Sequence, residues 1–258
     1  MLVFLLRLLR IIGLIVNNIL FFIIFVPALL ILKTLKIHYS KALLKSVRLW
    51  SVSNCLIMGI RVKIKGRYLE RGGRFIPCNH LSYTDVPVIA SIIPCVFVAK
   101  EEVKRWPLFG ILSSTAETIF VNRSSKKSTY MAIKYAEKVL SQGTNIVVFP
   151  EATTSDGLTI KKFNSAFFFL PERLEIDVQP VVISYLDQNK KPFTHEAAWY
   201  GDMNIFSHLW KITGLKRMYA VVYFCDMIKN KPENRLTRKD LAILCETAIK
   251  EKFHKITK

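Results

Sequence analysis

The pattern of hydrophobic positions changes once along the chain, near residue 59. Before that point, residues 11–32 contain no charged side chain, although Asn17, Asn18 and Pro27 interrupt their apolar character. As a helix, this stretch would be roughly 33 Å long, which matches the hydrocarbon thickness of a bilayer. It is too long for the apolar part of a secretory signal peptide, and burying a helix that is apolar on every side needs a very large protein. We therefore expect it to contact lipid.

The flanks of this stretch do not orient it in a membrane. Arg7 and Arg10 precede it while Lys33 and Lys36 follow it, so the positive-inside rule favours neither direction. Pro27 removes a backbone donor and favours a kink. We expect a membrane-associated helical hairpin or monotopic anchor rather than a straight span.

The next segment, residues 33–50, is basic on one face of a helical wheel and largely apolar on the other. Such a helix lies with its apolar face among acyl chains and its bases at lipid phosphates. The alternative is a helix that packs against the following domain and leaves its charged face in water. In either case, residues 1–58 are predicted to form membrane-anchoring helices.

From residue 59 onward, short β-rich runs alternate with helical ones. The predicted strands are residues 74–78, 95–100, 117–121, 145–149, 178–185 and 218–225. The predicted helices are residues 86–93, 128–141, 164–170, 203–210 and 238–253. This alternation predicts an α/β domain over residues 59–258, with a mostly parallel central sheet flanked by helices.

Composition adds a strong positive charge to this picture. The chain has 38 Lys and Arg against 19 Asp and Glu, a net charge of +19, and 51% of its residues are hydrophobic. This balance points to an anionic membrane phospholipid surface. After Glu70, bases and acids are mixed rather than gathered into a stripe with stacking aromatics, which argues against nucleic acid as a partner. The five Cys have wide spacings and no CxxC, so we expect reduced core residues.

Residues that carry chemistry follow the predicted strands, at the ends where α/β folds keep their sites. After strand 74–78 comes Asn79-His80-Leu81-Ser82-Tyr83-Thr84-Asp85. If Thr84 caps the next helix, the Asp85 carboxylate can reach His80 Nδ1, fix the tautomer and leave Nε2 free to take a proton. The alternative is a local hydrogen bond or helix cap without catalytic meaning.

Two further strand ends carry polar groups. Phe149-Pro150-Glu151-Ala152-Thr153-Thr154 follows one buried strand and presents donors at the sheet edge, unless it is an ordinary turn. Asn122 and Arg123 follow another strand. An arginine there can bind a phosphate through two parallel hydrogen bonds, although surface arginines are common.

Together these clusters resemble the glycerolipid (lysophosphatidic acid) acyltransferase family over roughly residues 66–185. The family signature consists of Asn-His-x-x-x-x-Asp, Phe-x-x-Arg and Phe-Pro-Glu-Gly blocks followed by a Pro-bearing strand. Here these blocks are Asn79–Asp85, Phe120–Arg123, Phe149–Ala152 and residues 178–183 with Pro180. The resemblance implies that His80 is the general base and that Asp85 orients it. The implied substrate-binding residues are Asn79, Asn122, Arg123, Phe149, Pro150, Glu151, Ala152, Thr153 and Thr154.

The resemblance also implies the reaction. A lysolipid hydroxyl attacks the thioester of acyl-CoA or acyl-carrier protein, without an acyl-enzyme, a cofactor or a metal. The usual acceptor is lysophosphatidate, and the product is phosphatidate. Because the donor is cytosolic and the acceptor lies in the bilayer, we expect the site on the cytoplasmic face of the inner membrane.

Two departures from the family pattern bear on the acceptor. Ala152 stands where the family has Gly, which carries strain if the position needs a positive φ. Thr154 stands where an Arg often contacts phosphate, which leaves Arg123, with Lys100 or Lys104, to bind the head group. Thr also occurs there in relatives that act on other lysolipids, so lyso-ornithine lipid or a lysophospholipid with a larger head group is the alternative acceptor.

Other classes of protein fit the sequence less well. A serine esterase would need a G-x-S-x-G elbow, which the chain lacks. A metal hydrolase would need a ligand cluster, but the other four His are scattered. A non-catalytic basic membrane-binding protein has no need for both His80 and Asp85.

Overall fold

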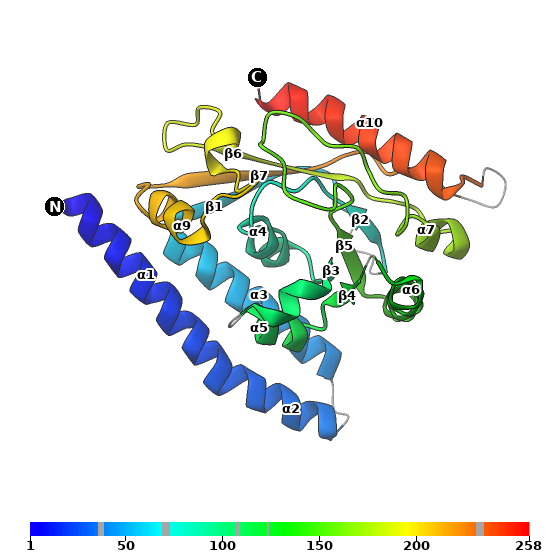
Figure 1. The fold of residues 1–258 in the computed structure, drawn as a ribbon, viewed down its shortest axis with the longest axis horizontal. Helices are drawn as coiled ribbons and strands as arrows, with labels where there is room; N and C mark the ends of the chain where they lie inside the picture. The colour runs from blue at the N-terminus through cyan, green and yellow to red at the C-terminus, as the bar shows by residue number, and fades with distance from the viewer. Residues whose placement is uncertain (36–38, 69–72, 107–108, 123, 231–234, 258) are drawn as a thin grey trace.

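The computed structural model describes residues 1–35, 39–68, 73–106, 109–122, 124–230 and 235–257. It begins with a long helical segment made of α1 (Leu2–Leu20), the π-helix η1 (Phe21–Phe25) and α2 (Val26–Thr34). Helix α3 (Tyr39–Met58) runs back beside this segment (Figure 1). The hairpin that we expected within residues 11–32 is therefore absent from the described residues; the helical pair consists of the whole segment 2–34 and α3.

The helix continues through Pro27 instead of turning there. Pro27 lies directly after the π-helical turn, in which Val26 N–H donates to the carbonyl of Phe21 five residues earlier. A wider turn of this kind accommodates the missing donor and the ring of proline. In the described residues, one helical segment, 2–34, is long and apolar enough to cross a membrane, and 11% of its apolar window is buried.

Helix α3 packs against the domain that follows it. Its side chains Leu43, Cys55 and Met58 are buried, and Arg48 Nε donates to the carbonyl of Ser91 at 3.1 Å. This is the second of the two arrangements considered for the basic segment. The predicted boundary after residue 58 falls in the turn between α3 and the first strand.

The strands of the domain are β1 (Ile60–Gly66), β2 (Phe75–Pro77), β3 (Cys95–Lys100), β4 (Ile119–Val121), β5 (Asn145–Val148), β6 (Val181–Leu186) and β7 (Met218–Phe224). Its helices are α4 (Asp85–Ile92), the 3-10 helix η2 (Glu101–Arg105), α5 (Phe109–Thr115), α6 (Lys126–Ser141), α7 (Phe169–Leu174), α8 (Thr194–Ala197), α9 (Ile205–Thr213) and α10 (Arg238–Thr257).

The sheet is mostly parallel, as predicted. Strands β2, β5, β3 and β4 lie in that order and are all parallel, while β1, β7 and β6 form a second group in which β6 is antiparallel to β7. Parallel bridges from Phe75 to Val178 and from Cys78 to Val181 join the two groups. Figure 1 shows α10 above the sheet and α4 and α3 below it.

The core follows the apolar strands. Phe75, Ile146, Val147 and Ile183 are fully buried, as expected for strands covered on both faces. All five Cys are buried and free of disulfides, which agrees with the prediction of reduced core thiols.

One predicted helix was wrong in its position. Helix α7 begins at Phe169, whereas we expected a helix from residue 164. Asn164 Oδ1 accepts a hydrogen bond from Ala166 N–H at 2.8 Å, and Asn164 N–H donates to the carbonyl of Pro150 at 2.9 Å. These bonds give the backbone partners that a helix would otherwise supply, so the chain stays a loop until Phe169.

Candidate active site

The loop after β2 brings His80 and Asp85 together. Asp85 is the first residue of α4 and is fully buried, while the His80 side chain is 20% exposed. Asp85 Oδ2 lies 2.8 Å from His80 Nδ1 and accepts from the backbone N–H of Leu81 at 2.7 Å and of Ser82 at 2.9 Å. Because a carboxylate only accepts, His80 Nδ1 carries the proton in this pair and Nε2 is left as the acceptor.

A third side chain, which sequence reasoning missed, completes the surroundings of the carboxylate. The Tyr185 hydroxyl, on β6, donates to Asp85 Oδ1 at 2.7 Å and lies 2.9 Å from Thr84 Oγ1. Tyr185 is fully buried, and desolvation together with the Asp85 charge raises its pKa well above the ordinary value, so it remains a donor. Thr84 therefore bonds Tyr185, although we expected its side chain to cap α4.

Asn79 fixes the start of the same loop. Its side-chain Nδ2 donates to the carbonyl of Ile183 at 3.0 Å, and its Oδ1 accepts from Ile183 N–H at 2.8 Å. The residue is fully buried. Both polar ends of its amide are thus used to tie the loop to β6, which holds the backbone beside His80 in place.

Glu151 ties the His80 loop to the loop after β5. Glu151 Oε1 accepts from His80 N–H and Oε2 accepts from Lys161 N–H, each at 2.8 Å. Burial raises the pKa of Glu151 to about 7, against the opposing effect of the two amide donors and of the charges on His80 and Lys161. Both oxygens thus face backbone amides rather than open solvent.

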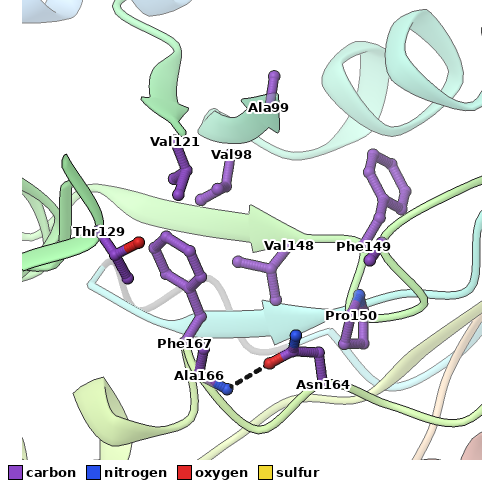
Figure 2. A pocket seen from close by; sticks show the side chains of 11 residues that line it. Val98, Ala99, Val121, Thr129, Val148, Phe149, Pro150, Asn164, Ala166 and Phe167 are labelled. Carbon is purple, nitrogen blue, oxygen red and sulfur yellow. Dashed lines mark hydrogen bonds between the residues drawn. The ribbon is translucent and has the colours of Figure 1, made fainter. Parts of the chain in front are cut away.

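An apolar cavity of about 190 Å³ opens between β3, β4, β5 and the loop that holds residues 164–167 (Figure 2). Val98, Val121 and Phe167 line it together with the ring of Phe149. The Phe149 ring also stacks on the His80 ring, with centroids 4.0 Å apart and planes at 15°. Phe149 therefore connects the cavity lining with the imidazole, and most of that lining suits hydrocarbon.

The loop after Glu151 shows the strain expected at Ala152. Its φ is +67°, in the left-handed region that L side chains rarely adopt. Thr153 is exposed, and the carbonyl of Thr154 accepts from Lys161 Nζ at 2.8 Å. Lys161, an exposed side chain that sequence reasoning missed, thus brings a positive charge to the position where the family often has Arg.

Replacing Ala152 with Gly should raise the free energy of unfolding by up to about 1.5 kcal/mol. Relief of the left-handed strain gains about 1–2 kcal/mol, and the greater freedom of glycine in the unfolded chain costs about 0.4–1 kcal/mol. Urea unfolding of the detergent-solubilised protein measures the change. Ala248→Gly within α10 is the matched control and should lose about 0.5–1 kcal/mol. A loss of stability in Ala152→Gly as large as in the control would contradict the strain.

The third predicted cluster lies at the start of α6. Asn122 Oδ1 accepts from the backbone N–H and the hydroxyl of Ser124, and Asn122 N–H donates to Ser128 Oγ at 3.0 Å. Arg123 lies outside the described residues. Since β2, β3, β4 and β5 are parallel, the three clusters follow the same edge of the sheet, as expected.

These features define an α/β enzyme-like site in which a His–Asp pair stands beside an apolar cavity at the carboxyl edge of a parallel sheet. A family model, Acyltransferase, matches residues 61–184. The chain is 30% identical over 203 residues to a lyso-ornithine lipid O-acyltransferase of Pseudomonas aeruginosa, covering 79% of this chain and 76% of that protein. The chain belongs to this acyltransferase family.

Other relatives and a solved structure agree with this assignment. The chain is 36% identical over 173 residues to a lyso-ornithine lipid O-acyltransferase of Rhizobium meliloti, covering 63% of this chain and 59% of that protein's length. It is 31% identical over 169 residues to a 1-acyl-sn-glycerol-3-phosphate acyltransferase of Neisseria gonorrhoeae, covering 65% of this chain and 66% of that protein. The crystal structure of PlsC, the LPA acyltransferase of Thermotoga maritima, shares the fold, with a TM-score of 0.66. The match covers 96% of this chain and 97% of that chain at 18% identity.

Proposed function

We propose that this protein transfers a fatty acyl group from an acyl thioester to the free hydroxyl of a lysolipid. The observation that carries the proposal is the His80–Asp85 pair, with Nε2 available beside an apolar cavity. His80 Nε2 takes the hydroxyl proton as the lysolipid oxygen attacks the thioester carbonyl. The carbon–sulfur bond then breaks, and the thiolate recovers the proton from the imidazolium.

The geometry supports direct transfer rather than an acyl-enzyme. Ser82, the hydroxyl nearest His80 in the sequence, is fully buried within the loop between β2 and α4. In this proposal the cavity lined by Phe149 takes the part of the acyl chain nearest the thioester, because apolar side chains dominate its lining. The donor in this proposal is acyl-CoA or acyl-carrier protein, whose phosphates or acidic surface suit a protein of net charge +19.

Two acceptors have specific support. Relatives named for 1-acyl-sn-glycerol-3-phosphate favour lysophosphatidate, and Lys161 at the Thr154 carbonyl offers a cation for its phosphate. Two observations favour lyso-ornithine lipid instead: position 154 is Thr rather than Arg, and the Pseudomonas and Rhizobium relatives are named for that acceptor. Transfer of labelled palmitate from palmitoyl-CoA to a panel of lysolipids decides between them. Failure with every acceptor and with an acyl-carrier-protein donor would refute the proposed activity.

In this proposal the helical segment 2–34 inserts into the membrane and keeps the catalytic domain on the cytoplasmic face, where the thioester donor is available. Its exposed apolar side chains support this role. Cosedimentation of the full chain with phosphatidylglycerol vesicles tests the association, and recovery of the protein in the supernatant would refute it.

Tyr185 acts in this mechanism as a positioning residue for Asp85. Replacing Tyr185 with Phe should lower kcat roughly tenfold or more with little change in KM, because the Asp85 carboxylate loses a bond that fixes its position beside His80 Nδ1. The less stabilised carboxylate should hold the imidazolium more strongly, so the acid limb of the pH profile of kcat/KM should move to higher pH.

Tyr219→Phe on β7, whose hydroxyl lies near Arg217, is the matched control and should leave the profile unchanged. A merely structural role for Tyr185 would lower the amount of active protein without moving the acid limb.

A further inference from the structure

The segment from Trp199 to Trp210, which includes the start of α9, is joined at one end to the catalytic loop. Trp199 N–H donates to the carbonyl of Leu81 at 2.8 Å. The Tyr83 ring meets Trp199 edge-on at 6.0 Å, and the Tyr83 hydroxyl lies 3.1 Å from His208 Nδ1. The backbone one residue beyond His80 is thus held by this segment.

The other end of the segment is joined to the N-terminal helix α1. The Trp210 ring meets Phe4 edge-on at 5.7 Å, and the Arg7 guanidinium lies 5.3 Å from its centre. Arg10 donates to the carbonyls of Thr213, Leu215 and Lys216, at the carboxyl end of α9. Arg7 and Arg10, which we expected to flank a membrane stretch, therefore dock α9 against α1, and Figure 1 shows the two helices side by side.

Between these two ends, the segment presents apolar side chains to the outside. Phe206 is 78% exposed and Met203 is 40% exposed. On α1, Phe4, whose ring meets Trp210, is itself 59% exposed, and Leu8 one turn further along is 41% exposed. Exposed apolar side chains on two elements in contact with each other mark an interaction site. Exposed bases lie near it on α9 and just beyond, at Lys211, Lys216 and Arg217, together with two exposed acids, Asp202 and Glu196.

We infer that Met203 and Phe206 insert into the lipid surface beside α1, so that the segment 199–210 is a second membrane contact that holds the His80 loop at the bilayer. The bilayer is the occupant because the surface continues that of α1 and is bordered by bases, which suit anionic head groups. This inference rests on the membrane association proposed above. A protein partner would instead cover the patch without lipid contact.

A fluorophore at position 206 tests the insertion. The full chain carrying Phe206→Cys is labelled with an environment-sensitive dye and bound to phosphatidylethanolamine–phosphatidylglycerol vesicles that contain a lipid-attached quencher. The five native Cys are buried, which directs the label to the new thiol. Ile243→Cys is the matched control, because Ile243 is 62% exposed on α10, on the side away from α1 (Figure 1).

We expect the label at 206 to shift to the blue and to be quenched, and the label at 243 to do neither. Unquenched label at 206 on protein that cosediments with the vesicles would overturn the inference while leaving membrane association by α1 intact. Protein that stays in the supernatant would overturn both.

Activity gives a second readout. Phe206→Ser should lower the ratio of kcat/KM for a vesicle-borne lysolipid to that for a short-chain, monomeric lysolipid roughly tenfold, since a large apolar contact with lipid is removed. Ile243→Ser should leave this ratio unchanged. An unchanged ratio in Phe206→Ser would overturn the role of the segment, whereas loss of transfer to every acceptor in the unmodified chain would refute the proposed function instead.

Discussion

Replacing His80 with Ala is expected to lower kcat for acyl transfer by roughly 10²- to 10⁴-fold, the range that a general base contributes. The reason is that, in the proposed mechanism, Nε2 of His80 accepts the proton of the lysolipid hydroxyl. The fold should survive the change, because Asp85 keeps its bonds from Leu81, Ser82 and Tyr185 after the imidazole is gone.

The measurement is transfer from labelled palmitoyl-CoA by detergent-solubilised protein, with thermal unfolding recorded beside it. His254→Ala is the matched control, since His254 is an exposed histidine in the last turn of α10. Transfer by His80→Ala at the rate of the unmodified protein would show that another group removes the proton. A loss of activity with an equal loss of folded protein would point to a structural role.

Much of the site could be predicted from the sequence because its parts are local. The alternation of short apolar runs with helical ones gave a parallel sheet, and parallel strands bring their carboxyl ends to one edge. His80 and Asp85 are five residues apart, so a single turn suffices to join them. The strain at Ala152 was likewise a local consequence of a residue that stands where glycine is expected.

The remaining features depend on contacts between distant parts of the chain. Tyr185 lies 100 residues from Asp85 and looks like an ordinary core residue of an apolar strand. Arg10 bonds backbone that lies more than 200 residues away, so its position before an apolar stretch was no guide to its partner. Asn164 stops a helix through one side-chain bond, against the periodicity around it.

Replacing Asp85 with Asn should lower kcat by roughly 10²- to 10³-fold without changing the tautomer of His80. The amide oxygen can keep its place opposite His80 Nδ1 and the N–H groups of Leu81 and Ser82, while the amide nitrogen faces the Tyr185 hydroxyl, which can turn to accept. What is lost is the negative charge that stabilises the imidazolium as it forms. Asp85→Ala, in contrast, leaves two buried amides without partners and should also lower the unfolding temperature.

The double variant separates a catalytic role of Asp85 from a structural one. If the carboxylate acts through the imidazole, adding Asp85→Asn to His80→Ala should change residual transfer by less than about twofold, because groups that act as a unit are not additive. If Asp85 instead serves mainly to fold the loop, the second substitution should lower transfer again and reduce the unfolding temperature of the His80→Ala protein. The first result assigns the charge of Asp85 to the proton transfer at Nε2, and the second would restrict Asp85 to holding the turn between β2 and α4.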